Sequence, residues 1–246
     1  GMMAEAFIEA GRLLERESLT ELALKTLQRI WDEAWNEEKG FRHKVSQKTE
    51  NESGPYLGDH AFYARASLSA FEITGDRIYL RRAEQVMDKA FEMLWNEERG
   101  GFYDTPPAED GHGFLKIPSQ PIQDSPTPGE NAVAALVLQR LFLLSENEKY
   151  RELAEKTLER FAGTVGQYGT FSSTFGLAVA QILKEPLHIL VIDDCESELW
   201  NAALKARYPL EIIQRYSKDD DFDKMPKVAQ SVVENMTLES VPIALI

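Results

Sequence analysis

The chain has 246 residues, of which 43% are hydrophobic, so it is long enough to bury a core in one large domain or in a large and a small one. Its formal net charge of -14 disfavours nucleic acid and anionic membrane surfaces as partners. A single cysteine, Cys195, excludes an intramolecular disulfide framework, and no run is long and apolar enough to span a bilayer, so we expect a cytoplasmic protein.

Helical periodicity organises the first three quarters of the chain. Apolar residues recur at helical spacing in segments that end at glycines, turns or loops. The predicted helices cover residues 3–14, 20–35, 59–74, 78–94, 129–144, 149–161 and 175–183, and Asp76 is expected to cap the fourth of them. Two long loops, residues 41–55 and 106–128, interrupt the helices. A loop as long as the second is more often functional than a simple connector.

Two patterns repeat along these helices. Residues 35–41 read WNEEKGF and residues 95–102 read WNEERGGF, about 60 residues apart. Residues 57–85 and 128–156 align at an offset of 71 and keep glycine, acid, apolar face and turn in register. Helices that are apolar all round alternate with helices that have one polar face, as two concentric layers of helices require. The predicted fold class is therefore mainly α, a partial (α/α) toroid of repeated helix hairpins.

After Pro186 the pattern changes to strands that alternate with helices. Compact apolar runs at residues 187–193, 210–216 and 241–246 predict three strands, and residues 196–207 and 228–236 predict two helices between them. Crossovers of this kind favour parallel strands. We expect a helical-hairpin domain of residues 1–186 and a small α/β unit of residues 187–246, which packs against the last helices and is truncated relative to its natural relatives.

Four segments together resemble a known family. They are LGDHA with its TGDxxYL turn, GGFYDT, DSPTPGEN at residues 124–131, and the strand LHILVID. They are similar to the C-terminal part of the thioredoxin-domain-containing family that includes spermatogenesis-associated protein 20. In that family a thioredoxin-like domain precedes an (α/α)6 toroid related to N-acylglucosamine 2-epimerases and six-hairpin glycosidases. The resemblance covers nearly the whole chain and implies that it matches the back half of such a protein.

The resemblance also implies positions for a site. Asp59 corresponds to the aspartate that opens the family's Asp-Tyr-Ala helix, and residues 100–105 correspond to its glycine-aromatic motif. Asp124 and Asn131 match the motif Asp-Gly-Ala-Glu-Pro-Ser-Gly-Asn-Ser, whereas Thr127 stands where the family has glutamate. The thioredoxin domain with its Cys-x-x-Cys is absent, so the resemblance carries over no redox activity, and no cofactor is expected.

Carboxylates near helix starts are the candidate catalytic groups. Asp59, Asp124 and Glu130 fall at loop-to-helix junctions, which gather at one rim of a helical toroid, where two carboxylates can act as acid and base on a sugar. The alternative is helix capping, which fits Asp59 and Glu130 better than Asp124, because Asp124 precedes its helix by several residues. The candidate substrate-binding residues are His60, Tyr63, Tyr103 and Asn131.

The histidines and the overall function leave alternatives open. His43, His60 and His112 lie on the loop side and can exchange protons near neutral pH, but scattered loop histidines are more often surface residues. Their spacing has no metal signature, so we expect no metal.

One hypothesis is a toroid that binds or converts a small sugar-like ligand. The other is a non-catalytic scaffold that accompanies a thioredoxin-like module, which the replaced glutamate and the short ring favour. A half ring exposes Ala-rich helices, so either the α/β unit and the N-terminal helix cover that edge or two copies pair through it, and we favour a homodimer.

Overall fold

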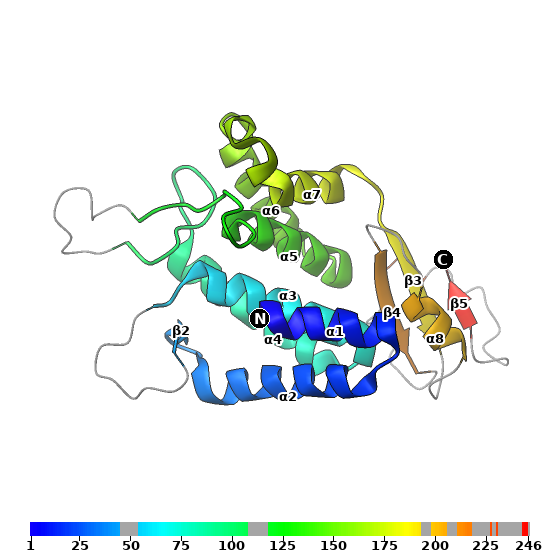
Figure 1. Ribbon diagram of the computed structural model, residues 1–246. Helices are drawn as coiled ribbons and strands as arrows, with labels where there is room; N and C mark the ends of the chain where they lie inside the picture. Colours follow the sequence, from blue (N-terminus) through cyan, green and yellow to red (C-terminus); the bar gives the residue numbers. More distant parts are fainter. Residues whose placement is uncertain are drawn as a thin grey trace.

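The computed structural model describes residues 1–44, 54–107, 118–192, 198–205, 211–217, 227, 230 and 243–245. Helix hairpins are followed by a small sheet (Figure 1). The helices are α1 (Met2–Leu14), α2 (Glu17–Ala34), α3 (Leu57–Thr74), α4 (Arg77–Leu94), α5 (Glu130–Ser145), α6 (Glu148–Ala162), the 3-10 helix η2 (Val165–Ser172), α7 (Ser173–Leu183) and α8 (Glu198–Lys205). The strands are β1 (Trp35–Asn36), β2 (Gly40–Phe41), β3 (Leu187–Ile192), β4 (Glu211–Tyr216) and β5 (Ile243–Leu245). His112, Cys195 and most of the helix predicted at residues 228–236 lie outside the described residues.

The helices form two layers, as the alternation of apolar and amphipathic segments predicts. Helices α1, α3, α5 and α7 pack against one another in sequence and form the inner layer, while α2, α4 and α6 each pair with the inner helix that precedes them. Figure 1 shows the inner helices running toward the sheet, so that their N-terminal ends lie at the opposite end of the molecule. The fold is mainly α, a partial (α/α) toroid of helix hairpins with a small C-terminal α/β unit, which confirms the predicted fold class.

The layers follow from where the apolar residues fall. Helices α3 and α5 bury side chains around most of their circumference, whereas α2, α4 and α6 bury one stripe and expose charged residues on the other side. Asp76 caps α4 by accepting a hydrogen bond from the Ile78 amide at 2.9 Å, as predicted. None of the described helices has the length and apolarity that crossing a bilayer requires.

Buried ion pairs connect two inner helices to one another and one inner helix to the sheet. Glu72 of α3 pairs with Arg140 of α5 at 2.6 Å, and both side chains are largely buried. Burial raises the pKa of Glu72 against the opposing effect of the Arg140 charge. Arg12 of α1 pairs with Glu211 of β4 at 2.9 Å, and both side chains are again largely buried. The inner layer is therefore joined by charge as well as by apolar packing.

The α/β unit corrects two predictions. Its strand order is β4-β3-β5, and β3 pairs with β4 in parallel but with β5 in antiparallel orientation. The crossover rule applies to β3 and β4 alone, because an antiparallel neighbour needs no crossover. The unit packs on α1 and α3 rather than on the last helices, since Ile212 of the edge strand β4 belongs to the main core and α8 lies against α1. The division into two domains stays a prediction.

Candidate functional site

The two repeated Trp-Phe motifs form the same turn after α2 and after α4. Trp35 pairs with Phe41 across the short β1–β2 ladder, and Trp95 pairs with Phe102 across an isolated antiparallel bridge. In each turn the asparagine after the tryptophan accepts hydrogen bonds from the backbone amides two and three residues later. The repeat seen in the sequence is therefore a repeat of backbone conformation.

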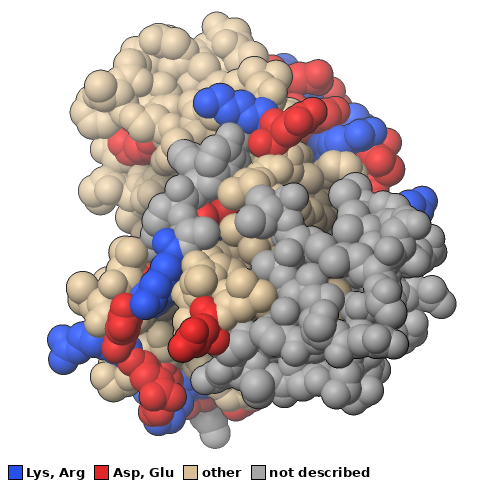
Figure 2. All heavy atoms as spheres, turned by 90° about the vertical axis from the view of Figure 1, so that its right-hand side faces the viewer, with Lys and Arg blue, Asp and Glu red and all other residues tan. Residues whose placement is uncertain are grey.

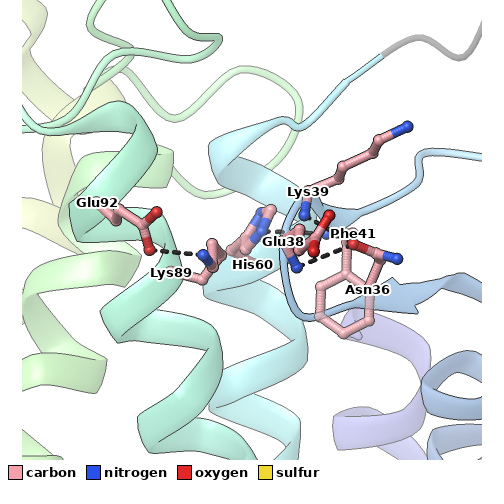
Figure 3. A network of polar contacts seen from close by, with 7 residues as sticks. All are labelled: Asn36, Glu38, Lys39, Phe41, His60, Lys89 and Glu92. Carbon is pink, nitrogen blue, oxygen red and sulfur yellow. Dashed lines mark hydrogen bonds and ion pairs between the residues drawn. The ribbon is translucent and has the colours of Figure 1, made fainter.

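Each turn is held by a buried polar side chain from the next inner helix. His60 of α3 accepts a hydrogen bond from the Phe41 amide through Nε2 at 3.2 Å (Figure 3). Asn131 of α5, its equivalent at the offset of 71, accepts one from the Phe102 amide through Oδ1 at 2.7 Å. Only glycine fits at Gly40, where φ is +71° and a Cβ atom would lie 2.5 Å from His60 Nε2.

These contacts engage the polar atoms of His60 and Asn131 with the backbone. His60 Nδ1 donates to the Tyr56 carbonyl at 2.8 Å, and burial lowers the pKa of His60, which keeps its ring neutral. Asn131 Nδ2 donates to the carbonyls of Phe102 and Pro121 at 2.9 and 2.8 Å. Both side chains are fully buried, so the structure places these two candidate binding residues beneath the rim, where they position the loops around it.

A cavity of about 390 Å³ opens at the rim where the inner helices begin. The starts of α1, α3 and α5 and the end of α2 form its walls, and its volume lies in the range usual for ligand pockets. Of the candidate residues it is lined by Asp59, Tyr63 and Glu130. His60, Tyr103, Asp124 and Asn131 are not among the described residues that line it.

Asp59 and Glu130 occupy equivalent positions in two repeats. Each lies in the first turn of an inner helix, and the two residues match at the same offset of 71 that relates His60 to Asn131. The N-cap residues themselves are Tyr56 and Gly129, which make no side-chain capping hydrogen bond. Both carboxylates lie in the first helical turn, where the helix dipole also favours a negative charge, so the helix-terminus alternative stays open beside the site hypothesis.

Glu130 is half-buried between α5 and α3. Burial raises the pKa of its carboxyl, and the negative charges of Asp104 and Asp59 raise it further. The carboxylate lies against Gly58, where a Cβ atom would come within 2.9 Å of Glu130 Oε1. The bare backbone at Gly58 thus lets Glu130 stay close to α3 and next to Asp59. A carboxyl with a raised pKa can carry and donate a proton at a higher pH than an ordinary glutamate.

Asp59 faces a histidine from the loop after β2. Its Oδ2 lies 2.9 Å from His43 Nδ1, and the His43 ring packs edge-on against Tyr56 with 5.0 Å between ring centroids. A proton held on Nδ1 by the carboxylate leaves Nε2 as the nitrogen that can accept a proton. The His43–Asp59 pair and Glu130 thus give the cavity one group suited to accept a proton and one suited to donate it.

Asp124 lies at the same rim but acts as a cap. Its Oδ1 accepts from the Gly129 amide at 2.7 Å and its Oδ2 from the Thr174 amide at 2.9 Å, so it joins the starts of α5 and α7. Burial alone would raise the pKa of Asp124, but the hydrogen bonds from Thr174 and Gly129 outweigh it and lower the pKa. The sequence predicted capping least for Asp124, because this residue precedes its helix by several positions. The sequence alone does not show that the path of the loop brings both amides to the Asp124 carboxylate.

The two candidate tyrosines have different surroundings. The Tyr63 ring packs on Phe41 with 4.6 Å between ring centroids, and its hydroxyl donates to the Leu27 carbonyl at 3.3 Å. Burial raises the pKa of Tyr63 to about 12, so the hydroxyl stays protonated. Tyr103 continues the second Trp-Phe turn by donating its backbone amide to the Leu94 carbonyl at 2.8 Å. Tyr63 therefore lies in the wall of the cavity with its ring almost fully buried, and Tyr103 supports the loop beside it.

The structure adds Tyr56 and Thr127, which line the cavity and which sequence reasoning did not select for the site. It also places His43, for which the sequence left a proton-exchanging and a surface role open, beside Asp59. The available signal was position: His43 lies two residues after the Phe41 turn, and Tyr56 immediately precedes α3. In the part of the chain that the structure describes, no three acidic, histidine or cysteine side chains are grouped to hold a metal ion.

The fold is that of (α/α)-toroid glycosidases. A GH76 alpha-mannanase from Bacteroides thetaiotaomicron, solved as a selenomethionine derivative, matches with a TM-score of 0.59 and 16% sequence identity over 82% of this chain and 54% of that chain. A family 76 glycoside hydrolase from a bovine Bacteroides thetaiotaomicron strain matches with a TM-score of 0.54 and 13% identity over 75% and 42% of the two chains. This chain thus spans about half the length of the solved structures it matches, and identities this low show the fold alone.

Sequence comparisons add no family. No protein-family model matches the chain, and no curated protein matches it. The resemblance to the thioredoxin-domain-containing family therefore stays a prediction, as does the cytoplasmic location.

Proposed function

We propose that this protein binds a small carbohydrate in the rim cavity and exchanges protons with it through Glu130 and the His43–Asp59 pair. The observation that carries the proposal is the position of Asp59 and Glu130. These carboxylates lie at equivalent places on adjacent inner helices, line one cavity and have different surroundings. Two acidic groups with divergent environments are the usual arrangement for acid and base work on a glycosidic centre.

The walls of the cavity support a sugar-like ligand. The half-buried ring of Tyr56 offers flat apolar surface, and the carboxylates of Asp59 and Glu130 can accept hydrogen bonds from hydroxyl groups. The solved structures with this fold are named as glycoside hydrolases, which agrees with the proposal at the level of fold. Glu130 would donate a proton, and His43 Nε2 would accept one, with Asp59 holding the imidazole in place.

The proposal is tested by thermal shift and calorimetry with simple hexoses, N-acylated hexoses and short oligosaccharides. A ligand at 100 times its Kd stabilises the folded state by about 2.7 kcal/mol, which raises the Tm of a chain of this size by roughly 5–10 °C. Glu130→Gln should lower the turnover of a bound sugar at least about 100-fold, because an amide keeps the shape of the protonated carboxyl but has no proton to donate. Glu38→Gln, in the exposed turn between β1 and β2 (Figure 3), is the matched control and should leave turnover unchanged.

Glu130→Gln also separates a functional carboxylate from a structural one. A glutamate with a raised pKa is stabilising for the fold only when protonated, and this contribution is lost as pH rises through its folded pKa. At neutral pH the Glu130→Gln variant should therefore melt at a higher temperature than the native protein while it loses turnover. A lower Tm, or a panel in which no sugar shifts the native protein, would refute the proposal and favour the non-catalytic scaffold.

A further inference from the structure

A single histidine ring connects two walls of the rim cavity. His60 Nδ1 lies 2.8 Å from the carbonyl oxygen of Tyr56, just before α3, and His60 Nε2 lies 3.2 Å from the amide nitrogen of Phe41 in β2 (Figure 3). Phe41 and Tyr56 both line the cavity, as does His43, two residues after Phe41. His60 itself is fully buried. Its ring therefore joins, from beneath, the two segments that supply these cavity residues.

The two contacts are compatible with one protonation state of the His60 ring. A carbonyl oxygen can only accept a hydrogen bond, so Nδ1 carries the proton, and the Phe41 amide can only donate one, so Nε2 presents its lone pair. A second proton on Nε2 would point at the hydrogen of the Phe41 amide. The ring has no room to turn aside, because the Gly40 backbone lies so close that a Cβ atom there would be 2.5 Å from Nε2. A protonated His60 therefore cannot keep the hydrogen bond to Phe41.

The equivalent side chain in the second repeat does not titrate. Asn131, at the offset of 71 from His60, accepts a hydrogen bond from the Phe102 amide and donates to the carbonyls of Phe102 and Pro121. A side-chain amide makes the same kinds of contact as a neutral imidazole, but it keeps them at any pH at which the protein is folded. The two turns thus differ in whether the side chain that holds them can take up a proton.

We propose that His60 is a pH-sensitive positioning residue of the rim cavity: when its buried ring takes up a proton, the turn that holds Phe41 and His43 is released, whereas the second turn stays closed. Release removes one wall of the cavity and withdraws His43 from Asp59. The consequence for a ligand rests on the proposed function, because His43 and Asp59 are its proton-accepting pair. The release of the turn is independent of any ligand.

The surroundings of His60 determine where its ring titrates. Burial lowers the pKa of His60 and outweighs the charge of Asp59, the preceding residue on α3, which raises it. Protonation of His43 would strengthen its pair with Asp59, so it opposes release rather than causing it. The other charged groups around the ring come from α4 and from the turn, and they are Lys89, Glu92, Glu38 and Lys39 (Figure 3). The two from α4 pair with one another. Release is therefore expected on acidification below about pH 6.5.

Amide hydrogen exchange, resolved by NMR on the full chain, tests the proposal without a ligand. Below about pH 6.5 the protection of the Phe41 amide should fall relative to that of Phe102, by up to about tenfold per pH unit, because His60 binds a proton more tightly in the open turn than in the closed one. The fall should level off at the pKa at which the His60 ring titrates in the native chain. Equal changes at the two amides, or a ratio that does not depend on pH, would overturn the proposal.

Two variants identify the group that takes up the proton. His60→Gln places an amide oxygen at about the reach of Nε2 and should keep the turn closed without the pH dependence at Phe41. His188→Gln is the matched control, because burial also lowers the pKa of His188, and it should leave that dependence unchanged. His188 belongs to β3, which lies at the right-hand end in Figure 1, the end that faces the viewer in Figure 2, away from the rim. A pH dependence that persists in His60→Gln, or that His188→Gln removes, would overturn the proposal.

A sugar that binds the native chain separates this inference from the proposed function. Its Kd should rise more steeply on acidification in the native chain than in His60→Gln, since the closed turn is the state that binds. A turn that opens as expected while no sugar binds supports the role of His60 and refutes the proposed function alone. A turn that stays closed on acidification overturns the role of His60, whichever sugars bind.

Discussion

Replacement of Asn131 by alanine tests whether a buried amide holds the second repeat together. The side chain of Asn131 accepts a hydrogen bond from the Phe102 amide at 2.7 Å and donates hydrogen bonds to the carbonyls of Phe102 and Pro121 at 2.9 and 2.8 Å. It is fully buried. Asn131→Ala removes all three hydrogen bonds at once. The Phe102 amide and carbonyl are then left in the core without that partner, where water cannot replace it.

The expected cost follows from the groups that lose their partner. A buried donor or acceptor without a hydrogen bond costs about 1–3 kcal/mol, and Pro121 still accepts from the Asn131 backbone amide. We therefore expect the free energy of unfolding to fall by about 3–5 kcal/mol, which is a large part of the stability of an ordinary domain. For a chain of this size the same change lowers the Tm by roughly 6–20 °C.

Urea denaturation followed by circular dichroism measures this cost. Asn36→Ala is the matched control, because Asn36 is exposed and its bonds to Glu38 and Lys39 can be replaced by water, so its cost should stay near 1 kcal/mol or below, about the net value of a hydrogen bond. Asn131→Asp keeps the shape but sets a carboxylate against two carbonyls, and it should destabilise as well. Equal costs for Asn131→Ala and Asn36→Ala would show that the buried amide does not hold the turn.

Two further predictions concern titration and buried charge. The pKa of His60 is lower in the folded protein than in the unfolded chain, so as the pH falls below about 6.5 the unfolded chain binds a proton before the folded protein does. The stability that neutral His60 contributes is therefore complete above that pH and is lost as the pH falls toward the folded pKa. His60→Asn should make the fall in unfolding free energy between pH 7 and pH 5 shallower, and an unchanged slope would contradict this. Glu72→Ala should cost about 3–5 kcal/mol because it leaves Arg140 buried without its partner. Glu33→Ala, which breaks an exposed pair with Arg29, should cost less than about 1 kcal/mol in the same urea titration.

The helices were predictable because their apolar faces are long and periodic. The offset of 71 between residues 57–85 and 128–156 also places Asp59 and Glu130 at matching positions in the sequence. The direction of β5 was not predictable, because a short apolar run has the same pattern in parallel and antiparallel pairs. The local sequence indicates where a strand forms, whereas the direction of the strand depends on the path of the connecting chain.

The candidate site shows the same division between local and distant information. Acidic residues at helix starts pointed to the rim, but their roles depend on which loop groups reach them. His43 comes to Asp59 from the loop after β2, and the backbone amides of Gly129 and Thr174 come to Asp124 from two helices. The sequence could suggest an acid at each position, but it could not distinguish the cap from the cavity carboxylates.

Because the cavity is shared between two repeats, it has an order of assembly. His43 and Asp59 leave the ribosome before Glu130, which emerges a full repeat later, and domains begin to form from the N-terminal side during synthesis. The cavity is complete only when α5 has docked on α3, where Glu130 meets Gly58. A molecule bound there would favour the docked state and protect the junction of the second and third hairpins from local opening.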